Sequence, residues 1–226
     1  MKYLSLFILF LLVSISAFGQ NDVTKFLGIP VDGPKSEMVK ALKSKGFKQN
    51  SIGDNEYFSG RFNGMDVDIY ISLESGKVSR LMVCDENTMG EGDIKIRFNK
   101  LCQQFKDNGK YFFLDDFTIS NDEDISYEMY VHNKRYEAIF YQLPEGDARE
   151  SLQSSILQNI QDKYSQEQLD NASDELKSQI YAECTSELLK AVQNKPVWFM
   201  ISEHYGKYYI TMFYDNELNR AQGQDL

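Results

Sequence analysis

The segment that most constrains the fold is VWFMISEHYGKYYITMFYDN, residues 197–216, which holds seven aromatic residues in twenty. Aromatic side chains are typical of strands, and Tyr205-Gly206 lies midway, where a tight hairpin turn is expected. Because side chains alternate along a strand, one face receives Val197, Phe199, Ile201, Tyr208, Ile210, Met212 and Tyr214. The other face receives Trp198, Met200, Ser202, Tyr209, Thr211, Phe213 and Asp215. The sequence therefore predicts a β-hairpin over residues 197–215, with aromatic side chains on both faces of a sheet.

Residues 20–84 have the pattern of one helix followed by three strands. Pro34 suits the first turn of a helix and Gly46 suits its end, so a helix is predicted between them. The strands EYFSGRF and MDVDIYIS flank Asn63-Gly64, a strong hairpin-turn signal. A third strand, KVSRLMVC, completes this α-β-β-β unit.

Residues 85–143 predict a second α-β-β-β-like unit. A helix over residues 92–108 is indicated by apolar side chains at helical spacing, namely Ile94, Phe98, Leu101 and Phe105. The segment YFFLDDFTI is expected to add a strand, and SYEMYVH and KRYEAIFYQ to form a hairpin about Asn133-Lys134. The two units match in length better than in residues, so an internal repeat is inferred from the order and the lengths of their elements.

Residues 144–195 interrupt the strand pattern with a helical insert. Apolar side chains recur at helical spacing in two stretches, and Ser165-x-x-Gln168 between them resembles a capping box. A helical hairpin is predicted here, and the pattern leaves open whether it covers the sheet or stands clear of it. Residues 196–226 form the last hairpin and a tail. Residues 20–226 are thus expected to be a single α+β domain with a mostly antiparallel sheet and helices on one face.

The first twenty residues, MKYLSLFILFLLVSISAFGQ, have the pattern of a signal peptide. Lys2 supplies the positive start, an apolar run follows, and Ala17-Phe18-Gly19 matches a cleavage site before Gln20. A membrane anchor is the alternative, but the apolar run is shorter than the ~20 residues that span a bilayer. We predict a cleaved signal peptide over residues 1–19 and export to the periplasm or the medium, with no stable membrane span. No cysteine lies near the cut, so the protein is not expected to be a lipoprotein.

The formal net charge of −10 argues against one class of partner. An acidic chain without a basic stripe repels phosphate backbones, so nucleic-acid binding is not expected. The sequence also lacks the G-x-S-x-G, H-E-x-x-H, P-loop and dinucleotide-binding patterns. The two histidines, His132 and His204, stand near predicted turns and are interpreted as exposed turn residues. No catalytic residue and no cofactor is assigned.

Two of the three cysteines allow two interpretations. Cys84 ends an apolar strand, and Cys102 lies among the apolar side chains of a predicted helix, as expected of buried thiols. Because an exported protein meets an oxidising environment, a Cys84–Cys102 disulfide is the alternative. The geometry of the fold decides between them.

The segment LDDFTISNDEDIS, residues 114–126, is acidic and contains no basic residue. Carboxylates in loops can bind calcium, and Asp122 and Asp124 are the weak candidates, yet the segment lacks the order of an EF-hand loop. We interpret it as a solvated loop and assign no metal. A pair of hydrolase carboxylates is the alternative.

Alternation in the other predicted strands gathers aromatic side chains on the face away from the core. We predict a binding surface there, formed by Tyr70, Tyr130, Tyr141, Trp198 and Tyr209. Aromatic rings with polar tips supply a large contact area and tolerate water. Two alternatives stay open. Aromatic residues favour strands for their own packing, and the helical insert would bury this face if it packed on it.

Three segments carry a resemblance to a known family: FLGIPVDGPKSEMVKALKSKGF, MVCDENTMGEGDIKIRFNKLCQQF and YGKYYITMFYDNELNRAQGQDL. Together they resemble a family of uncharacterised exported proteins from Bacteroidota, over most of the chain except the insert. The resemblance implies export and an α+β domain, and it carries over no catalytic residues. The helix-then-three-strands rhythm is also similar to β-lactamase-inhibitor-protein-like folds. It is similar as well to small envelope lipoproteins of outer-membrane assembly, whose lipid-bearing cysteine this chain lacks.

These features favour an exported, non-enzymatic binding or inhibitor-like module whose partner is a protein or a glycan. An exported hydrolase with paired carboxylates and a structural envelope protein are the alternatives. A hydrolase requires two acids in one pocket, at least one of them with a raised pKa. A structural protein requires a large apolar patch that is buried on self-association.

Overall fold

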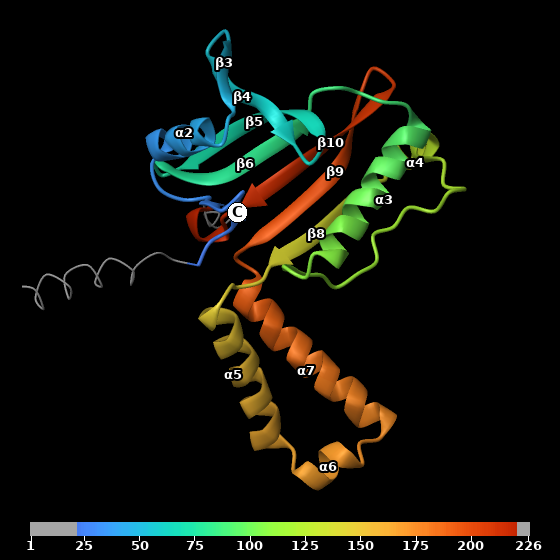
Figure 1. Cartoon of the computed structure of the whole chain (residues 1–226). Helices are drawn as coiled ribbons and strands as arrows, with labels where there is room; N and C mark the ends of the chain where they lie inside the picture. The colour runs from blue at the N-terminus through green and yellow to red at the C-terminus, as the bar shows by residue number, and fades with distance from the viewer. Residues whose placement is uncertain (1–21, 221–226) are drawn as a thin grey trace, which may run out of the picture.

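The computed structural model describes residues 22–220 and has an eight-stranded sheet at its centre (Figure 1). Every neighbouring pair of strands is antiparallel, and the order is β3-β4-β5-β6-β10-β9-β8-β7. The strands are β3 (Lys48–Ile52), β4 (Asn55–Phe62), β5 (Met65–Glu74), β6 (Lys77–Asp85), β7 (Tyr111–Phe112), β8 (Glu137–Gln142), β9 (Pro196–His204) and β10 (Lys207–Asp215). A short ribbon of β1 (Lys25–Phe26) and β2 (Ile29–Pro30) precedes them. The predicted signal peptide, residues 1–19, lies outside the described residues.

Helices lie at three places around the sheet (Figure 1). They are α2 (Lys35–Ser44), α3 (Glu91–Asp107), α4 (Ile125–His132), α5 (Asp147–Lys163), α6 (Gln166–Asp170), α7 (Asp174–Val192) and the 3₁₀ turn η2 (Glu217–Asn219). Within residues 22–220, none of these helices combines the length and the apolar character needed to cross a membrane.

Local turn chemistry explains the predicted hairpins. Asn63 and Gly64 have φ values of 50° and 81°, and Tyr205 and Gly206 have 50° and 73°. Two successive residues with positive φ form the turn that matches the twist of a hairpin. The β4–β5 hairpin and the C-terminal β9–β10 hairpin are therefore confirmed.

The core lies between one face of the sheet and the helices α2 and α3. Met38 and Leu42 of α2 and Phe98 of α3 are almost fully buried. The sheet contributes buried side chains from its inner face: Phe58, Val67, Ile69, Leu81, Val83, Ala138, Phe140, Val197, Phe199, Ile201, Ile210 and Met212. These positions alternate along each strand, as the sequence pattern predicted. The α+β class, with an antiparallel sheet and α2 and α3 on one face, is confirmed.

The second predicted unit is wrong at its middle strand. The segment SYEMYVH forms the helix α4 and not a strand, and there is no hairpin about Asn133-Lys134. The Asp124 side chain accepts a hydrogen bond from the Tyr127 amide at 2.8 Å, which caps the helix start, and Asn133 ends it with φ of 52°. These caps outweigh the strand-like alternation of Tyr, Met and Val. The order in this half of the chain is therefore α-β-α-β.

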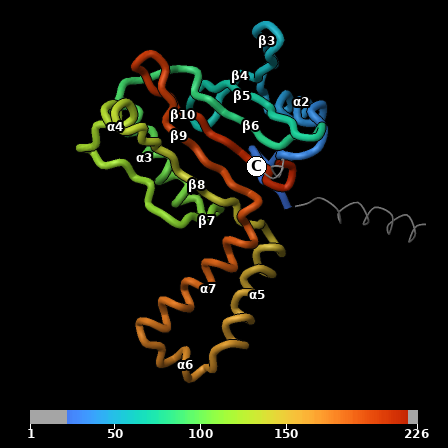
Figure 2. Tube along the Cα trace, turned by 180° about the vertical axis from the view of Figure 1, so that it is seen from behind, coloured from blue at the N-terminus to red at the C-terminus, as the bar shows by residue number. Residues whose placement is uncertain are grey.

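The insert is a two-helix arm that stands clear of the sheet (Figures 1 and 2). The helices α5 and α7 pack against each other, and the short α6 connects them. The predicted capping box is confirmed at the start of α6, where Ser165 and Gln168 exchange both hydrogen bonds. In both views the arm extends from one end of the sheet, so it leaves the face opposite α2 and α3 uncovered.

Candidate functional site

The face of the sheet opposite α2 and α3 is open and carries the candidate site. In Figure 2 the strands β8, β9, β10 and β6 face the viewer, and α3 lies behind them. Trp198, Tyr209 and Tyr70 on this open face are half-buried, although side chains one residue away in the same strands are fully buried in the core. An aromatic side chain that neighbouring strands cover only in part presents one ring face or edge to a partner.

The strand register aligns six large side chains in one row across the open face. Trp198 of β9 lies opposite Ile139 of β8 on one side and Phe213 of β10 on the other. The row continues because Met82 of β6 lies opposite both Phe213 and Tyr70 of β5. Phe58 of β4 lies opposite Ile69 of β5, so the preceding residue of β4, Tyr57, lies opposite Tyr70 and is the sixth member. We call this set the aromatic row: Tyr57, Tyr70, Met82, Phe213, Trp198 and Ile139.

Stacked ring pairs hold neighbouring members of the aromatic row together. The rings of Trp198 and Phe213 are stacked, with centroids 4.0 Å apart and an interplanar angle of 16°. The rings of Tyr57 and Tyr70 are stacked with centroids 5.9 Å apart. Six side chains across neighbouring strands, spaced by ~4.8 Å, extend over roughly 24 Å. The row is therefore a continuous apolar ridge, in which Phe213 is itself only 9% exposed and its half-buried neighbours supply the accessible surface.

A buried carboxylate fixes the orientation of the Trp198 indole. Asp215 accepts a hydrogen bond from Trp198 Nε1 at 2.9 Å and two from Arg80, at 2.5 and 2.7 Å. The Arg80 guanidinium also lies 4.9 Å from the Phe213 ring centroid, within cation–π range. The hydrogen bond to Asp215 raises the pKa of Arg80. The indole is thus held in place before any partner arrives, which lowers the entropic cost of binding.

A hollow of about 830 Å³ opens beside Trp198 at this end of the row. Its lining combines apolar and charged side chains, among them Ile139, Tyr141, Arg80 and Arg135. A pocket next to a fixed Trp and an Arg is the setting in which interface hot spots occur.

The flank at the far end of the aromatic row is acidic. Asp68 occupies the next position along β5 on the same face as Tyr70, and it lies opposite Cys84 of β6. Burial raises the pKa of Asp68, and the charge of Glu86 raises it further. The neighbouring acid Glu86 thus makes this flank favourable for a cation.

The predicted binding residues divide into three groups. Tyr70 and Trp198 are members of the aromatic row, and Tyr141 and Tyr209 lie on the same face in neighbouring rows, opposite Pro196 and Ser202. Tyr130 was wrongly placed, because it lies on α4, 89% exposed and away from the open face. The error follows from the strand that was predicted over that segment.

Four members of the aromatic row, Tyr57, Met82, Phe213 and Ile139, were not among the predicted binding residues. The Asn63-Gly64 turn could have indicated which β4 side chains face the core. Phe58 is buried in the core, so the preceding residue, Tyr57, points to the open face. Met82 lies in a mostly apolar stretch of β6, so the sequence does not single it out. Only the pairing of β6 with β10 places it beside Phe213.

The alternative Cys84–Cys102 disulfide is wrong, because the two thiols lie on opposite faces of the sheet. Cys84 points to the open face, with its Sγ 4.0 Å from Thr211 Oγ1. Cys102 is 1% exposed on the core side of α3. Both are free thiols. No rotamer change joins side chains that a sheet separates.

These thiols should resist alkylation in the native protein. Burial raises the pKa of Cys84 to about 11 and that of Cys102 to about 12. At pH 8 a thiol with a pKa of about 11 is ionised in roughly one molecule per thousand, and the thiolate is the reactive form. Iodoacetamide at pH 8 should label Cys102 only after denaturation, as read by peptide mass mapping. Labelling of Cys102 as fast as of free cysteine would contradict the buried placement, and a mass deficit of two hydrogens would reveal a disulfide.

The acidic loop uses its carboxylates for local structure. Asp122 is hydrogen-bonded to Ser120, Asp124 caps α4, and Asp116 pairs with Lys106 at 2.6 Å. No cluster of three metal-ligating side chains occurs in residues 22–220. Hydrogen bonds lower the pKa of Asp116, Asp122 and Glu123, with Lys106, Ser120 and Lys134 as their principal partners. A hydrolytic acid requires the opposite shift, so this loop does not favour the hydrolase alternative.

The two histidines show no common site in the described part of the chain. His132 lies at the end of α4, and its Nδ1 is 2.8 Å from Glu128 of the same helix. His204 is exposed at the end of β9, next to the Tyr205-Gly206 turn. Each is therefore accounted for by its own local structure.

The fold and the open face define this chain as an α+β protein with one covered and one uncovered face of an antiparallel sheet. Comparison with family models, with curated proteins and with solved structures finds no match.

Proposed function

We propose that this protein is an exported, non-enzymatic binding module that recognises a partner protein through the aromatic row. One observation carries the proposal. Six strands each contribute one large apolar or aromatic side chain to a continuous ridge that no helix of residues 22–220 covers. Export follows from the signal peptide predicted over residues 1–19.

The dimensions of the ridge suit an amphipathic helix of the partner. A ridge of roughly 24 Å matches about 16 residues of α-helix. The open face of a sheet commonly packs against helices, and α2 and α3 do so on the covered face of this sheet. Trp, Tyr, Met and Arg, which all lie in or beside the row, are the side chains that protein interfaces favour. We therefore infer a partner helix with an apolar stripe along the row and basic residues over Asp68 and Glu86.

The experiment identifies the partner and tests the row together. A photo-crosslinking amino acid at position 82, in the middle of the row, should join the exported protein to its partner in the producing cell. The same amino acid at position 130, on the exposed side of α4, serves as the control. Trp198→Ala and Tyr70→Ala should each weaken binding of the identified partner by roughly thirty-fold, the effect of losing a hot spot. Tyr130→Ala should leave the affinity unchanged.

Three outcomes would overturn this proposal. Equal crosslinking from positions 82 and 130, or affinity that survives both row variants, removes the row from recognition. Crosslinks to glycan replace the protein partner by a carbohydrate. Crosslinks to a second copy, with a molecular mass that falls on dilution, indicate a self-associating structural protein.

A further inference from the structure

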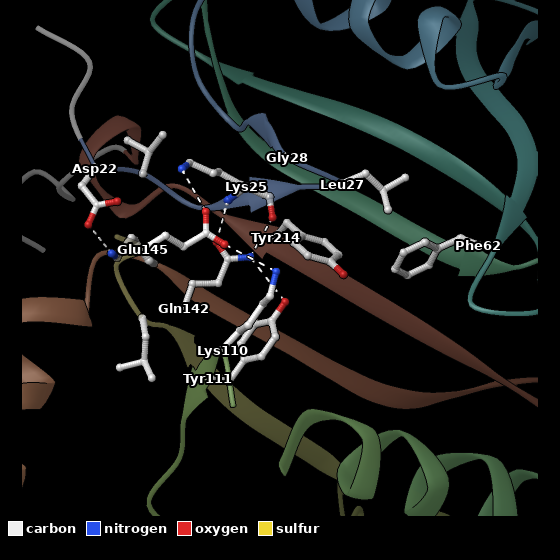
Figure 3. A pocket seen from close by; sticks show the side chains of 13 residues that line it. Asp22, Lys25, Leu27, Gly28, Phe62, Lys110, Tyr111, Gln142, Glu145 and Tyr214 are labelled. Carbon is white, nitrogen blue, oxygen red and sulfur yellow. Dashed lines mark hydrogen bonds and ion pairs between the residues drawn. The ribbon is translucent and has the colours of Figure 1, made fainter. Parts of the chain in front are cut away.

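A second hollow lies on the covered side of the sheet, where the N-terminal segment passes the end of α3 (Figure 3). Two adjoining cavities of about 420 and 650 Å³ share four lining residues, Leu27, Phe62, Tyr111 and Tyr214. We call this space the β1–α3 groove. It is lined by β1 and its turn, by β4, β7, β8 and β10, and by the end of α3, so it depends on segments from the whole chain.

The wall of the groove is fastened by hydrogen bonds and ring packing. The Gln142 side chain accepts from the Lys25 amide and donates to the Lys25 carbonyl, both at 2.7 Å, as a neighbouring strand would. Phe26 is fully buried against Phe62 and Tyr214, with ring centroids 5.0 and 4.9 Å apart. The groove is therefore built into the fold and is present before a ligand binds.

One polar group that faces the groove has no hydrogen-bond partner among residues 22–220. Tyr214 is 4% exposed, yet its hydroxyl makes no hydrogen bond with any residue of the described range 22–220. Figure 3 shows this hydroxyl pointing into the space between Tyr111 and Phe62. Burial raises the pKa of Tyr214 well above its ordinary value, so the group remains a hydrogen-bond donor. Among the described residues no fully buried side-chain polar atom lacks a partner, so the Tyr214 hydroxyl is accessible from the groove. A hydroxyl that opens into a groove can donate its proton to a ligand that enters it.

The charge at the mouth of the groove is positive. The Lys25 and Lys110 ammonium groups lie 3.8 and 3.5 Å from the single carboxylate of Glu145. All three side chains are exposed, so their arrangement can change when a ligand enters. Opposite them, Leu27 and Phe62 provide an apolar surface.

We propose that the β1–α3 groove binds a small amphipathic carboxylate. Its apolar body packs on Phe62 and Leu27, its carboxylate accepts the Tyr214 hydroxyl hydrogen bond, and Lys110 supplies the countercharge. The site lies on the opposite face of the sheet from the aromatic row. It is therefore independent of the proposed protein partner.

Binding is tested with 4-phenylbutyrate as the probe and 4-phenylbutanol as its uncharged match. In the mature exported protein, amide shifts on titration with phenylbutyrate should map to the groove, around Leu27, Phe62 and Tyr111. Tyr214→Phe keeps the ring and removes only the hydroxyl, and it should weaken phenylbutyrate binding about tenfold, as loss of a charge-assisted hydrogen bond does. Lys110→Gln, at an exposed position, should weaken phenylbutyrate binding and leave phenylbutanol binding unchanged.

Several results would overturn the groove site. The first is the absence of amide shifts at ~10 mM probe, a concentration above a millimolar dissociation constant. The second is a set of shifts that map to the aromatic row. The third is a Tyr214→Phe variant that binds phenylbutyrate as tightly as the wild type does. An unchanged amide spectrum and melting temperature of Tyr214→Phe in the absence of the probe show that the variant is folded, so its affinity reports the hydroxyl alone.

Discussion

Replacing Phe199 with alanine should lower the free energy of unfolding by about 3–5 kcal/mol, the cost of removing a large buried aromatic. Phe199 is fully buried in β9. Its ring is stacked with that of Phe140 at 6.0 Å and lies edge-on to that of Phe98 at 5.1 Å. The strand β9, the neighbouring strand β8 and the helix α3 thus meet on this one side chain, and the cavity left by alanine has rigid walls.

Urea denaturation followed by far-UV circular dichroism measures this effect. The neighbouring variant Trp198→Ala is the matched control, because its side chain lies on the open face and leaves no closed cavity. We expect the midpoint of unfolding to fall much further for Phe199→Ala than for Trp198→Ala, with the denaturant dependence unchanged. Similar losses for both variants would mean that the two faces of the sheet are equally packed, and the open face would then be a second core.

Replacing Asp85 with alanine should lower the free energy of unfolding by a similar amount, about 3–5 kcal/mol, because it leaves a buried guanidinium without its counterion. Asp85 accepts two hydrogen bonds from Arg97 of α3, at 2.6 and 2.8 Å. The Asp85 and Arg97 side chains are only 3% and 14% exposed. This pair links the end of β6 to the helix that follows it in sequence, at the edge of the core.

A double variant separates the pair from the packing around it. Asp85→Ala combined with Arg97→Leu removes both charges, and it should recover a large part of the stability that Asp85→Ala loses. Asp116→Ala, which breaks the exposed pair with Lys106, should change stability little. If the double variant were less stable than Asp85→Ala alone, the cost would arise from lost packing and not from the unpaired charge.

The errors made from sequence share one physical cause. Tyr127, Met129 and Val131 alternate as in a strand, and β7 pairs only with Tyr141 and Gln142 of β8, so a free edge was present beside residues 137–140. The segment nevertheless forms a helix, because Asp124 and Asn133 cap its two ends. Tyr130 was assigned to the wrong surface for this reason alone. Periodicity over seven residues does not distinguish a strand from a short capped helix.

The sequence by itself determined the local features of this protein. Turn residues and alternating side chains specify the β4–β5 and β9–β10 hairpins and their two faces, because both signals act between near neighbours along the chain. Only the tertiary structure decided that β6 pairs with β10, which brings Met82 beside Phe213 and completes the aromatic row. It alone placed Tyr214 under the N-terminal segment and held the arm clear of the sheet. These outcomes depend on contacts between distant segments, which form only when the core packs as a whole.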